Sequence, residues 1–491
     1  MGAMARPTKR TKIVATLGPA TDSEEMLRRL IDAGMDVARL NFSHRTAEQA
    51  KPLVELVRGV ADQMGVFVGI LGDLRGPRIR VGEMEGGSIE LQRGKKIILT
   101  SEKVIGTPEK IGVSFKGLCR DVIAGSFILL DDGNIELQVI EIRPNGDIVC
   151  EIVRGGELKS NKGVNLRNRL VSLPSLTTKD YVDLDFAVEE QLDFLALSFV
   201  QSASDVRFLK QALAERGASI PVIAKIERQN ALDDIENIVR ECYGVMVARG
   251  DLALEMSFED VPIAQKRIIS VCRDAGVPVI TATQMLESMI TFHKPTRAEA
   301  ADIANAILDG TDAVMLSAES AVGKFPVEAV ATMSTIAIRA EAAWTSGELP
   351  GPAPIPDRGD LEAAVANAVH VIANSVSAKA IIAATTSGGT PRRVACHRPK
   401  MPILALCSSN EVCRKLALNW GVEPTLVEPI GGTAHLVKLS AEAAMRILGA
   451  KMSDVLAITA GTPFNVAGKT NLIKVEQIGD ALKADKASVG E

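Results

Sequence analysis

Residues 221–252 read PVIAKIERQNALDDIENIVRECYGVMVARGDL, and this stretch decides the fold. Two short apolar runs, 221–227 and 244–252, flank a segment with a helical pattern, and each run ends in polar residues spaced by two. Apolar runs that alternate with helical segments are typical of parallel β-strands joined by helices. The stretch therefore predicts a strand–helix–strand unit with polar side chains at the strand ends.

The same alternation continues on both sides of this stretch. Ser23 and Gly34 mark the start and end of the first connecting helix. The apolar runs form two groups, and together they indicate eight units: 11–18, 36–43, 67–74, 192–200, 221–227, 244–252, 278–285 and 312–320. Eight such units over about 250 residues predict a (β/α)8 TIM barrel, and a doubly wound sheet is the alternative.

Two other regions interrupt and follow the barrel pattern. Residues 75–170 alternate apolar and polar side chains and contain Asp-Gly and Asn-Gly turns, which predicts an inserted all-β lid in the form of a β-barrel. The Pro/Gly-rich segment 345–359 is expected to be a linker. We therefore expect a barrel domain in two parts, 1–74 and 171–344, and a C-terminal three-layer α/β domain over 360–491.

Composition excludes several classes of protein. The chain has 491 residues, a net charge of −5 and only 3% aromatic residues, which disfavours binding to nucleic acid or to an anionic membrane. No apolar run is long enough to span a membrane, and the first residues lack the apolar core of a signal peptide. Seven cysteines without a CxxC pair predict reduced thiols, so we expect a cytoplasmic protein.

Polar residues recur with a spacing of two where the predicted barrel strands end. This spacing places side chains on one face of a strand, and barrel active sites lie at the C-terminal ends of the strands. For any single pair, the alternative is a structural ion pair that closes the barrel. Taken together, the residues predict a ring around the barrel mouth: Arg39, Asn41, Ser43, Asp73, Arg75, Lys225, Glu227, Arg249, Asp251, Thr281, Thr283, Ser317 and Glu319.

The residue types in this ring favour metal-assisted chemistry on a phosphoryl group or an enolate. Glu227 and Asp251 offer hard oxygen ligands without His or Cys, which suits Mg²⁺ or Mn²⁺. Lys225 and Arg39 offer fixed cations for a phosphoryl group in transit. The lid follows Asp73 directly, so we expect it to exclude water from the mouth.

Seven segments resemble the pyruvate kinase family and occur in that family's order: TKIVATLGPA (11–20), RLNFSH (39–44), IAKIE (223–227), MVARGDL (246–252), TATQMLESMI (281–290), PTRAE (295–299) and DGTDAVMLSAES (309–320). The resemblance covers nearly the whole chain. It implies glycolytic phosphoryl transfer from phosphoenolpyruvate to ADP, giving pyruvate and ATP, with Mg²⁺ or Mn²⁺ as the cofactor. It also implies a homotetramer.

The resemblance further implies roles for individual residues. Lys225 would stabilise the transferred phosphoryl group and the enolate, Arg39 would bind the phosphate, and Glu227 with Asp251 would hold the divalent metal. Thr283 would lie on the side from which the enolate is protonated. The same match assigns the amides of Arg249, Gly250 and Asp251 to the substrate carboxylate. It makes Ser198, Ser317 and Glu319 supporting residues. It also assigns the nucleotide to Arg75, Arg80, His44, Asn41 and the lid residue Lys162.

The chain also departs from the family pattern at one hinge position. Potassium-dependent members hold K⁺ at positions that match Asn41, Ser43, Asp73 and the carbonyl of Leu74, and they usually carry Glu where this chain has Arg78. A fixed guanidinium there would replace the ion, so we expect activity without K⁺. The alternative is that Arg78 is an ordinary surface charge.

A loop in the C-terminal domain is the candidate effector site. Its hydroxyls and amides precede a predicted helix, a position that suits a phosphate: Thr385, Thr386, Ser387, Gly388, Gly389 and Thr390. Gly389 stands where many family members carry a basic residue. The loop therefore indicates a phosphorylated effector without specifying fructose 1,6-bisphosphate, and an ordinary strand-to-helix turn is the alternative.

Two other functions compete with the family assignment. A metal-dependent barrel lyase or aldolase acting on pyruvate or oxaloacetate enolates would share Glu227 and Asp251 but would not need the lid. A phosphometabolite-sensing scaffold would have lost catalysis, yet Lys225 and Thr283 are both present. Pyruvate formation that depends on ADP separates the three.

Overall fold

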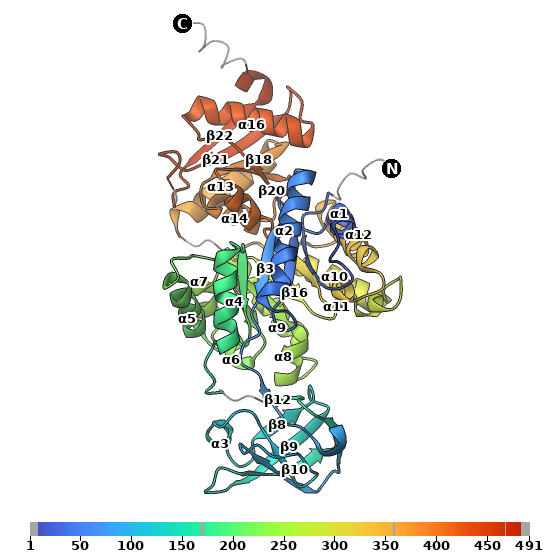
Figure 1. The fold of residues 1–491 in the computed structure, drawn as a ribbon. Helices are drawn as coiled ribbons and strands as arrows, with labels where there is room; N and C mark the ends of the chain where they lie inside the picture. Colours follow the sequence, from blue (N-terminus) through green and yellow to red (C-terminus); the bar gives the residue numbers. More distant parts are fainter. Residues whose placement is uncertain (1–7, 168–170, 357–358, 467, 483–491) are drawn as a thin grey trace.

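The computed structural model describes residues 8–167, 171–356, 359–466 and 468–482. The expected lid boundary at residue 170, linker residues 357–358 and the two chain ends lie outside these ranges. A barrel occupies the middle of the molecule, with the β-rich lid at one end and the C-terminal domain at the other (Figure 1).

The central domain is a closed barrel of eight parallel strands, as predicted. The strands follow the order β1-β17-β16-β15-β14-β13-β3-β2 around the barrel, so β3 and β13 are neighbours although the lid separates them in sequence. Their bounds are β1 Lys12–Thr16, β2 Val37–Asn41, β3 Gly69–Asp73, β13 Phe194–Leu197, β14 Val222–Ile226, β15 Gly244–Ala248, β16 Val279–Ala282 and β17 Ala313–Leu316.

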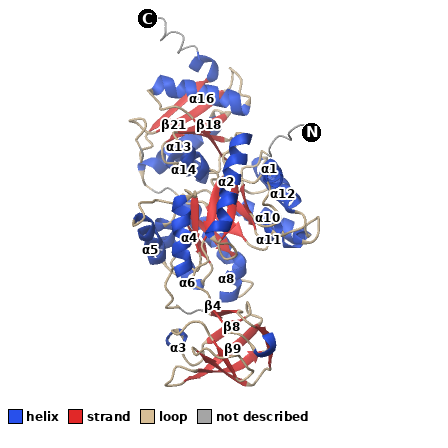
Figure 2. Ribbon diagram, viewed as in Figure 1, coloured by secondary structure: helices blue, strands red, loops and turns tan. Residues whose placement is uncertain are grey.

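Helices surround this barrel (Figure 2). The first of them confirms the predicted caps: the Ser23 side chain accepts a hydrogen bond from the amide of Met26, and Gly34 ends the helix with φ 116°. The helices are α1 Glu24–Ala33, α2 Ala47–Met64, α4 Thr178–Glu189, α5 Ala203–Ala214, α6 Gln229–Asp233, α7 Ile235–Glu241, α8 Arg249–Glu255, α9 Val261–Ala275, α10 Arg297–Asp309, α11 Ala318–Ala321 and α12 Pro326–Thr345.

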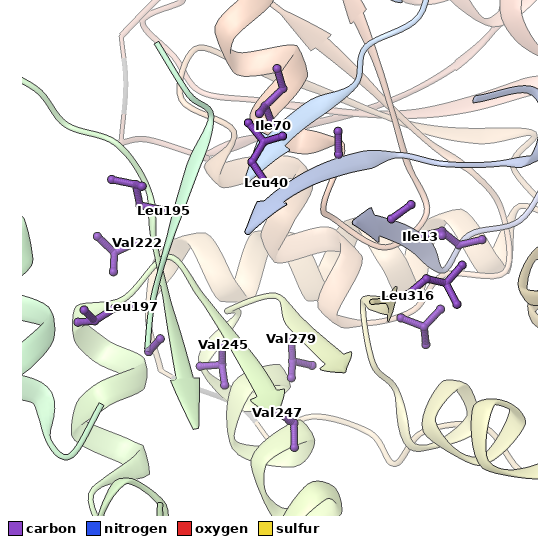
Figure 3. Packing of buried hydrophobic residues seen from close by; sticks show 14 of the residues in the cluster. Ile13, Leu40, Ile70, Leu195, Leu197, Val222, Val245, Val247, Val279 and Leu316 are labelled. Carbon is purple, nitrogen blue, oxygen red and sulfur yellow. The ribbon is translucent and has the colours of Figure 1, made fainter. Parts of the chain in front are cut away.

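The barrel strands bury both of their faces. Alternate residues such as Val14 and Leu71 belong to a small core inside the barrel. The residues between them, including Ile13, Ile70 and Val245, belong to a larger core shared with the helices (Figure 3). Each fully buried aliphatic side chain of this kind contributes about 1.5–3 kcal/mol, so the two cores give the site a rigid support.

The lid is a rolled sheet around its own core. Its seven-stranded sheet has the order β4-β12-β8-β9-β10-β6-β7, and a separate pair joins β5 to β11. An antiparallel bridge between Val81 and Val113 joins the two edges of the roll, and a parallel bridge links Met84 to Gly106. A short helix, α3 (Leu118–Asp121), interrupts the all-β pattern. The strands are β4 Ile79–Arg80, β5 Ser88–Leu91, β6 Lys96–Thr100, β7 Lys110–Gly112, β8 Phe127–Leu130, β9 Ile135–Ile142, β10 Ile148–Arg154, β11 Gly156–Lys159 and β12 Gly163–Leu166.

The C-terminal domain has three layers, as predicted. Its five-stranded sheet has the order β20-β19-β18-β21-β22, with β22 antiparallel, and a separate hydrophobic cluster packs on each face. The elements are α13 Leu361–Ser375, β18 Ala380–Thr385, α14 Gly389–Cys396, β19 Ile403–Cys407, α15 Asn410–Leu416, β20 Val422–Leu426, α16 Thr433–Leu448, β21 Val455–Ala460 and β22 Leu472–Gln477.

Buried polar contacts join this domain to the base of the barrel. Asp312 precedes β17, and its Oδ1 accepts hydrogen bonds from Arg398 Nη1 (3.1 Å) and from the amide of Trp420 (3.4 Å). Its Oδ2 accepts from the amide of Val279, the first residue of β16. The Arg398 guanidinium also lies 5.0 Å from the Trp420 ring centre. The C-terminal domain is thus attached to the N-terminal ends of barrel strands.

Two further predictions can be checked against the described residues. None of their helices is both long and apolar enough to cross a lipid bilayer. All seven cysteines lie in the described ranges and are free thiols, as predicted.

Candidate active site

Four charged residues meet at the C-terminal mouth of the barrel. Arg39 in β2 donates from Nε and Nη2 to Asp73 Oδ2 at 2.8 and 2.6 Å. Lys225 in β14 lies 3.3 Å from Asp73 Oδ1 and 2.9 Å from Glu227 Oε1. All four side chains are at most 13% exposed. The predicted ring residues on β2, β3 and β14 are therefore brought together.

The charges in this cluster control each other's protonation. Burial lowers the pKa of Lys225, but the carboxylates of Asp73 and Glu227 outweigh it, and the net shift is upward. Burial raises the pKa of Asp73, but Lys225 and Arg39 outweigh it, and the net shift is downward. Lys225 is thus a fixed cation and Asp73 a fixed anion at neutral pH.

Glu227 behaves differently from Asp73. Burial raises its pKa, Lys225 opposes the shift, and the nearby carboxylate of Asp251 adds to it, so the net shift is upward. Glu227 is buried and Asp251 is half-buried, and two neighbouring carboxylates of this kind are stabilised by a bound cation.

The donor set at Glu227 and Asp251 fits a divalent ion that keeps other ligands. Within the described residues, His, Cys, Asp and Glu form no group of three or more able to hold a metal. Mg²⁺ is commonly held by one or two carboxylates together with water and substrate oxygens, because it gives up its water reluctantly. Glu227 and Asp251 therefore match Mg²⁺ or Mn²⁺ bound jointly by protein and substrate.

Ser198 and Thr16 complete the base of the cluster. Lys225 Nζ donates to Ser198 Oγ (2.7 Å), and Ser198 in turn donates to the carbonyl of Leu74 (2.8 Å). Arg39 Nη1 donates to Thr16 Oγ1 (2.8 Å). The sequence reasoning missed Thr16, although it is the last residue of β1 and follows the same rule of polar strand ends.

Thr283 lies beside Gly250 and Asp251 because the backbone turns into a left-handed conformation directly after β16 ends at Ala282. Thr283 has φ 65°, a left-handed conformation, and its Oγ1 accepts a hydrogen bond from the amide of Gly250 at 3.0 Å. Arg249 begins α8, and its guanidinium donates hydrogen bonds to the carbonyl of Thr283 and to Asp302 (both 2.6 Å). The side chain of Arg249 therefore contacts the loop after β16 and α10.

Thr281 does not belong to the ring, which corrects the sequence prediction. It is completely buried, and its hydroxyl donates to Thr311 Oγ1 at 3.0 Å. Along β16, Ile280 and Ala282 face the barrel interior, so Thr281 faces the surrounding helices. Thr283 reaches the mouth because its left-handed backbone breaks the spacing of two.

Ser317 and Glu319 lie behind the mouth. Glu319 is buried, and its carboxylate accepts hydrogen bonds from the amides of Leu286 (3.1 Å) and Ser317 (2.7 Å). It therefore ties the loop after β16, which carries Thr283, to the start of α11.

The predicted nucleotide residues lie on both sides of the lid hinge. Asn41 ends β2 and His44 follows it, and the His44 amide donates to the Asn41 carbonyl at 3.2 Å. Lys162 in the lid pairs with Asp131 (2.7 Å). Burial lowers the pKa of Arg80, and the neighbouring Arg78 and Arg75 lower it further. These arginines form a positive cluster between the lid and the barrel.

Three of the four groups of the predicted monovalent site, those of Asn41, Asp73 and Leu74, already accept hydrogen bonds. Asn41 Oδ1 accepts from the amide of Ser43 (3.0 Å), and Asp73 and Leu74 bind the cations and Ser198 described above. Arg78 instead pairs with Asp132 of the lid at 2.8 Å.

The predicted effector loop lines a pocket in the C-terminal domain. Thr385, Thr386, Ser387, Gly389 and Thr390 line it, whereas Gly388 shapes the turn with φ 87°. The sequence reasoning missed Arg393, which lies one helical turn after Gly389 and also lines the pocket. The four-residue spacing on α14 could have identified it.

Comparisons with known proteins agree with this architecture. The family model "Pyruvate kinase, barrel domain" matches residues 8–330, and "Pyruvate kinase, alpha/beta domain" matches residues 363–476. The chain belongs to the pyruvate kinase family. Pyruvate kinases of Staphylococcus epidermidis and Staphylococcus aureus are 45% identical over 480 residues, which is 96% of this chain and 81% of theirs.

A solved pyruvate kinase has the same fold. The crystal structure of the Cryptosporidium parvum pyruvate kinase superposes with a TM-score of 0.90 and 37% identity over 96% of both chains. The chain is thus an enzyme of the transferase class, and the barrel, lid and C-terminal domain are common to the pyruvate kinase fold.

Proposed function

We propose that the protein transfers a phosphoryl group from phosphoenolpyruvate to ADP, giving pyruvate and ATP in the cytoplasm. The cluster of Arg39, Asp73, Lys225 and Glu227 carries this proposal. It holds two fixed cations beside a carboxylate suited to a metal, under a lid that excludes water.

Arg39 and Lys225 bind the phosphoryl group in this proposal. Asp73 and Thr16 fix the Arg39 guanidinium by three hydrogen bonds, so its position is set before substrate binds. Because its pKa is shifted upward, Lys225 remains charged and offers a cation to both the phosphoryl oxygens and the enolate.

Glu227 and Asp251 would hold the divalent metal, which supplies positive charge to the enolate and phosphate oxygens when it is bound. The amides of Arg249, Gly250 and Asp251 would receive the substrate carboxylate. Thr283, held by the Gly250 amide, would position the proton delivered to the enolate, with Ser317 and Glu319 supporting its loop.

The nucleotide is assigned to the positive cluster at the lid hinge. Arg75, Arg80 and Lys162 would bind its phosphates from the lid side, and Asn41 and His44 from the barrel side. In the present conformation Lys162 is paired with Asp131, so nucleotide binding must replace this carboxylate by phosphate oxygens.

Three finer assignments complete the proposal. Arg78 would make K⁺ unnecessary, the C-terminal pocket would bind a phosphorylated effector, and four copies of the chain would assemble.

A coupled assay of pyruvate formation tests the main proposal. We expect formation to require ADP, and Lys225→Met to lower kcat by at least about a thousandfold because a preorganised charge is lost. Lys379→Met, an exposed lysine of the C-terminal domain, is the control. Pyruvate formation without ADP would favour the lyase alternative, and unchanged turnover of a folded Lys225→Met would remove the assigned role.

A further inference from the structure

The loop after β13, residues 198–202, contacts both chain segments that connect the barrel to the lid. On the outgoing segment, the carbonyl of Leu74 accepts a hydrogen bond from Ser198 Oγ at 2.8 Å. On the returning segment, Val171 exchanges two hydrogen bonds with the side chain of Gln201, both at 3.0 Å. The loop therefore holds both segments about which the lid would rotate relative to the barrel.

Phe199 in this loop contacts the carboxylate of Glu227. Its amide donates to Glu227 Oε2 at 2.7 Å, while Lys225 Nζ lies 2.9 Å from Glu227 Oε1. Phe199 has φ 57°, a left-handed conformation that aromatic residues rarely adopt. Strained backbone of this kind persists where surrounding contacts enforce it, and it occurs frequently at functional sites.

The ring of Phe199 lies between the outgoing hinge and a buried arginine. A Cβ added to Gly76 would lie only 3.1 Å from Phe199 Cδ2 and equally close to Ser198 Cβ, and Gly76 itself has φ 66°. Arg228 places its guanidinium 5.6 Å from the ring centre and is 8% exposed. Its Nε and Nη1 are buried and have no hydrogen-bond partner within the described part of the chain. The arginine therefore holds the ring against the hinge by a cation–π contact.

We propose that Phe199 is a positioning residue through which the lid hinge controls the orientation of the Glu227 carboxylate. This inference rests on the metal-binding role proposed above for Glu227. A lid movement that displaces Gly76 pushes the Phe199 ring. Movement of the ring shifts the backbone of Phe199, whose amide donates the hydrogen bond to Glu227 Oε2. Metal affinity and lid position are then linked, and each must affect the other.

Binding of Mn²⁺ to the full chain without substrates tests the link, with free Mn²⁺ measured by electron paramagnetic resonance. Removing a group that orients a metal ligand commonly weakens binding tenfold or more, so we expect Phe199→Leu to raise the Kd for Mn²⁺ about tenfold. Phe199→Tyr retains the ring and should stay within about twofold of the parent. Phe208→Leu, an exposed phenylalanine on α5, is the matched control.

A double-mutant cycle tests the route through the hinge. Gly76→Ala should weaken Mn²⁺ binding by itself, and its effect should be clearly smaller in the Phe199→Leu background, because the contact with the ring is gone and only the contact with Ser198 remains. Unchanged affinity in a folded Phe199→Leu, or additive losses in the double variant, would overturn the inference. If Phe199→Leu does not fold, an unchanged Mn²⁺ affinity of Gly76→Ala would also overturn the inference. Parental affinity in Glu227→Gln would instead overturn the proposed metal role.

Discussion

Arg78 is a fixed charge next to the hinge, and its contribution can be tested directly. In the Arg78→Glu variant the guanidinium is replaced by a carboxylate, so a monovalent cation would be needed beside it. We expect the parent enzyme to keep most of its activity with tetramethylammonium in place of K⁺. Arg78→Glu should lose at least about tenfold under those conditions and recover when K⁺ is added. Initial rates in the two buffers measure this.

Arg143→Glu provides a matched control, because Arg143 is an exposed arginine of the same lid. It should behave as the parent in both buffers. A large loss of parental activity without K⁺ would show that Arg78 does not replace the ion.

Among the single elements, helix α14 supplies Arg393, a basic side chain that lines the effector pocket. The effector loop itself contains no basic residue. Arg393→Ala should raise the half-saturating concentration of a phosphorylated effector tenfold or more, since a charge-assisted hydrogen bond contributes about 1.5–3 kcal/mol. Basal turnover should not change, because the pocket is in a different domain from the active site. Rates across a panel of sugar phosphates and AMP measure the effect. Equal responses in the parent and in Arg393→Ala would contradict the assignment of this pocket.

Most elements could be predicted from sequence because their signals are local. Ser23 and Gly34 marked the ends of α1, and the spacing of two in IAKIE placed Lys225 and Glu227 together. The same spacing placed Thr281 wrongly, because the chain turns into a left-handed conformation after Ala282 and only Thr283 reaches the mouth. The contact between Phe199 and the hinge was also beyond prediction, since it joins residues far apart in sequence.

At the scale of the whole molecule, Asp312 and Arg398 fasten the C-terminal domain to the base of the barrel. Both are largely buried, and removing one partner of a buried ion pair costs about 3–5 kcal/mol. Arg398→Leu should therefore lower the midpoint of thermal unfolding by about 3–5 °C, measured by calorimetry. Arg339→Leu breaks an exposed pair with Glu348 and should cost less than about 1 kcal/mol. Equal midpoints for the two variants would show that the buried pair does not hold the domains together.

The insertion of the lid between β3 and β13 has a consequence for how the chain reaches its native state. Leu71 pairs with Phe194 in the barrel, so the strands must meet across the whole inserted segment. Closing a loop costs more entropy as the loop lengthens, and contacts distant in sequence slow folding. The lid has its own hydrophobic core, and its two ends return to one loop at Leu74 and Val171. Once the lid has folded, β3 and β13 are joined by a short connection, and the barrel can close as though they were consecutive strands.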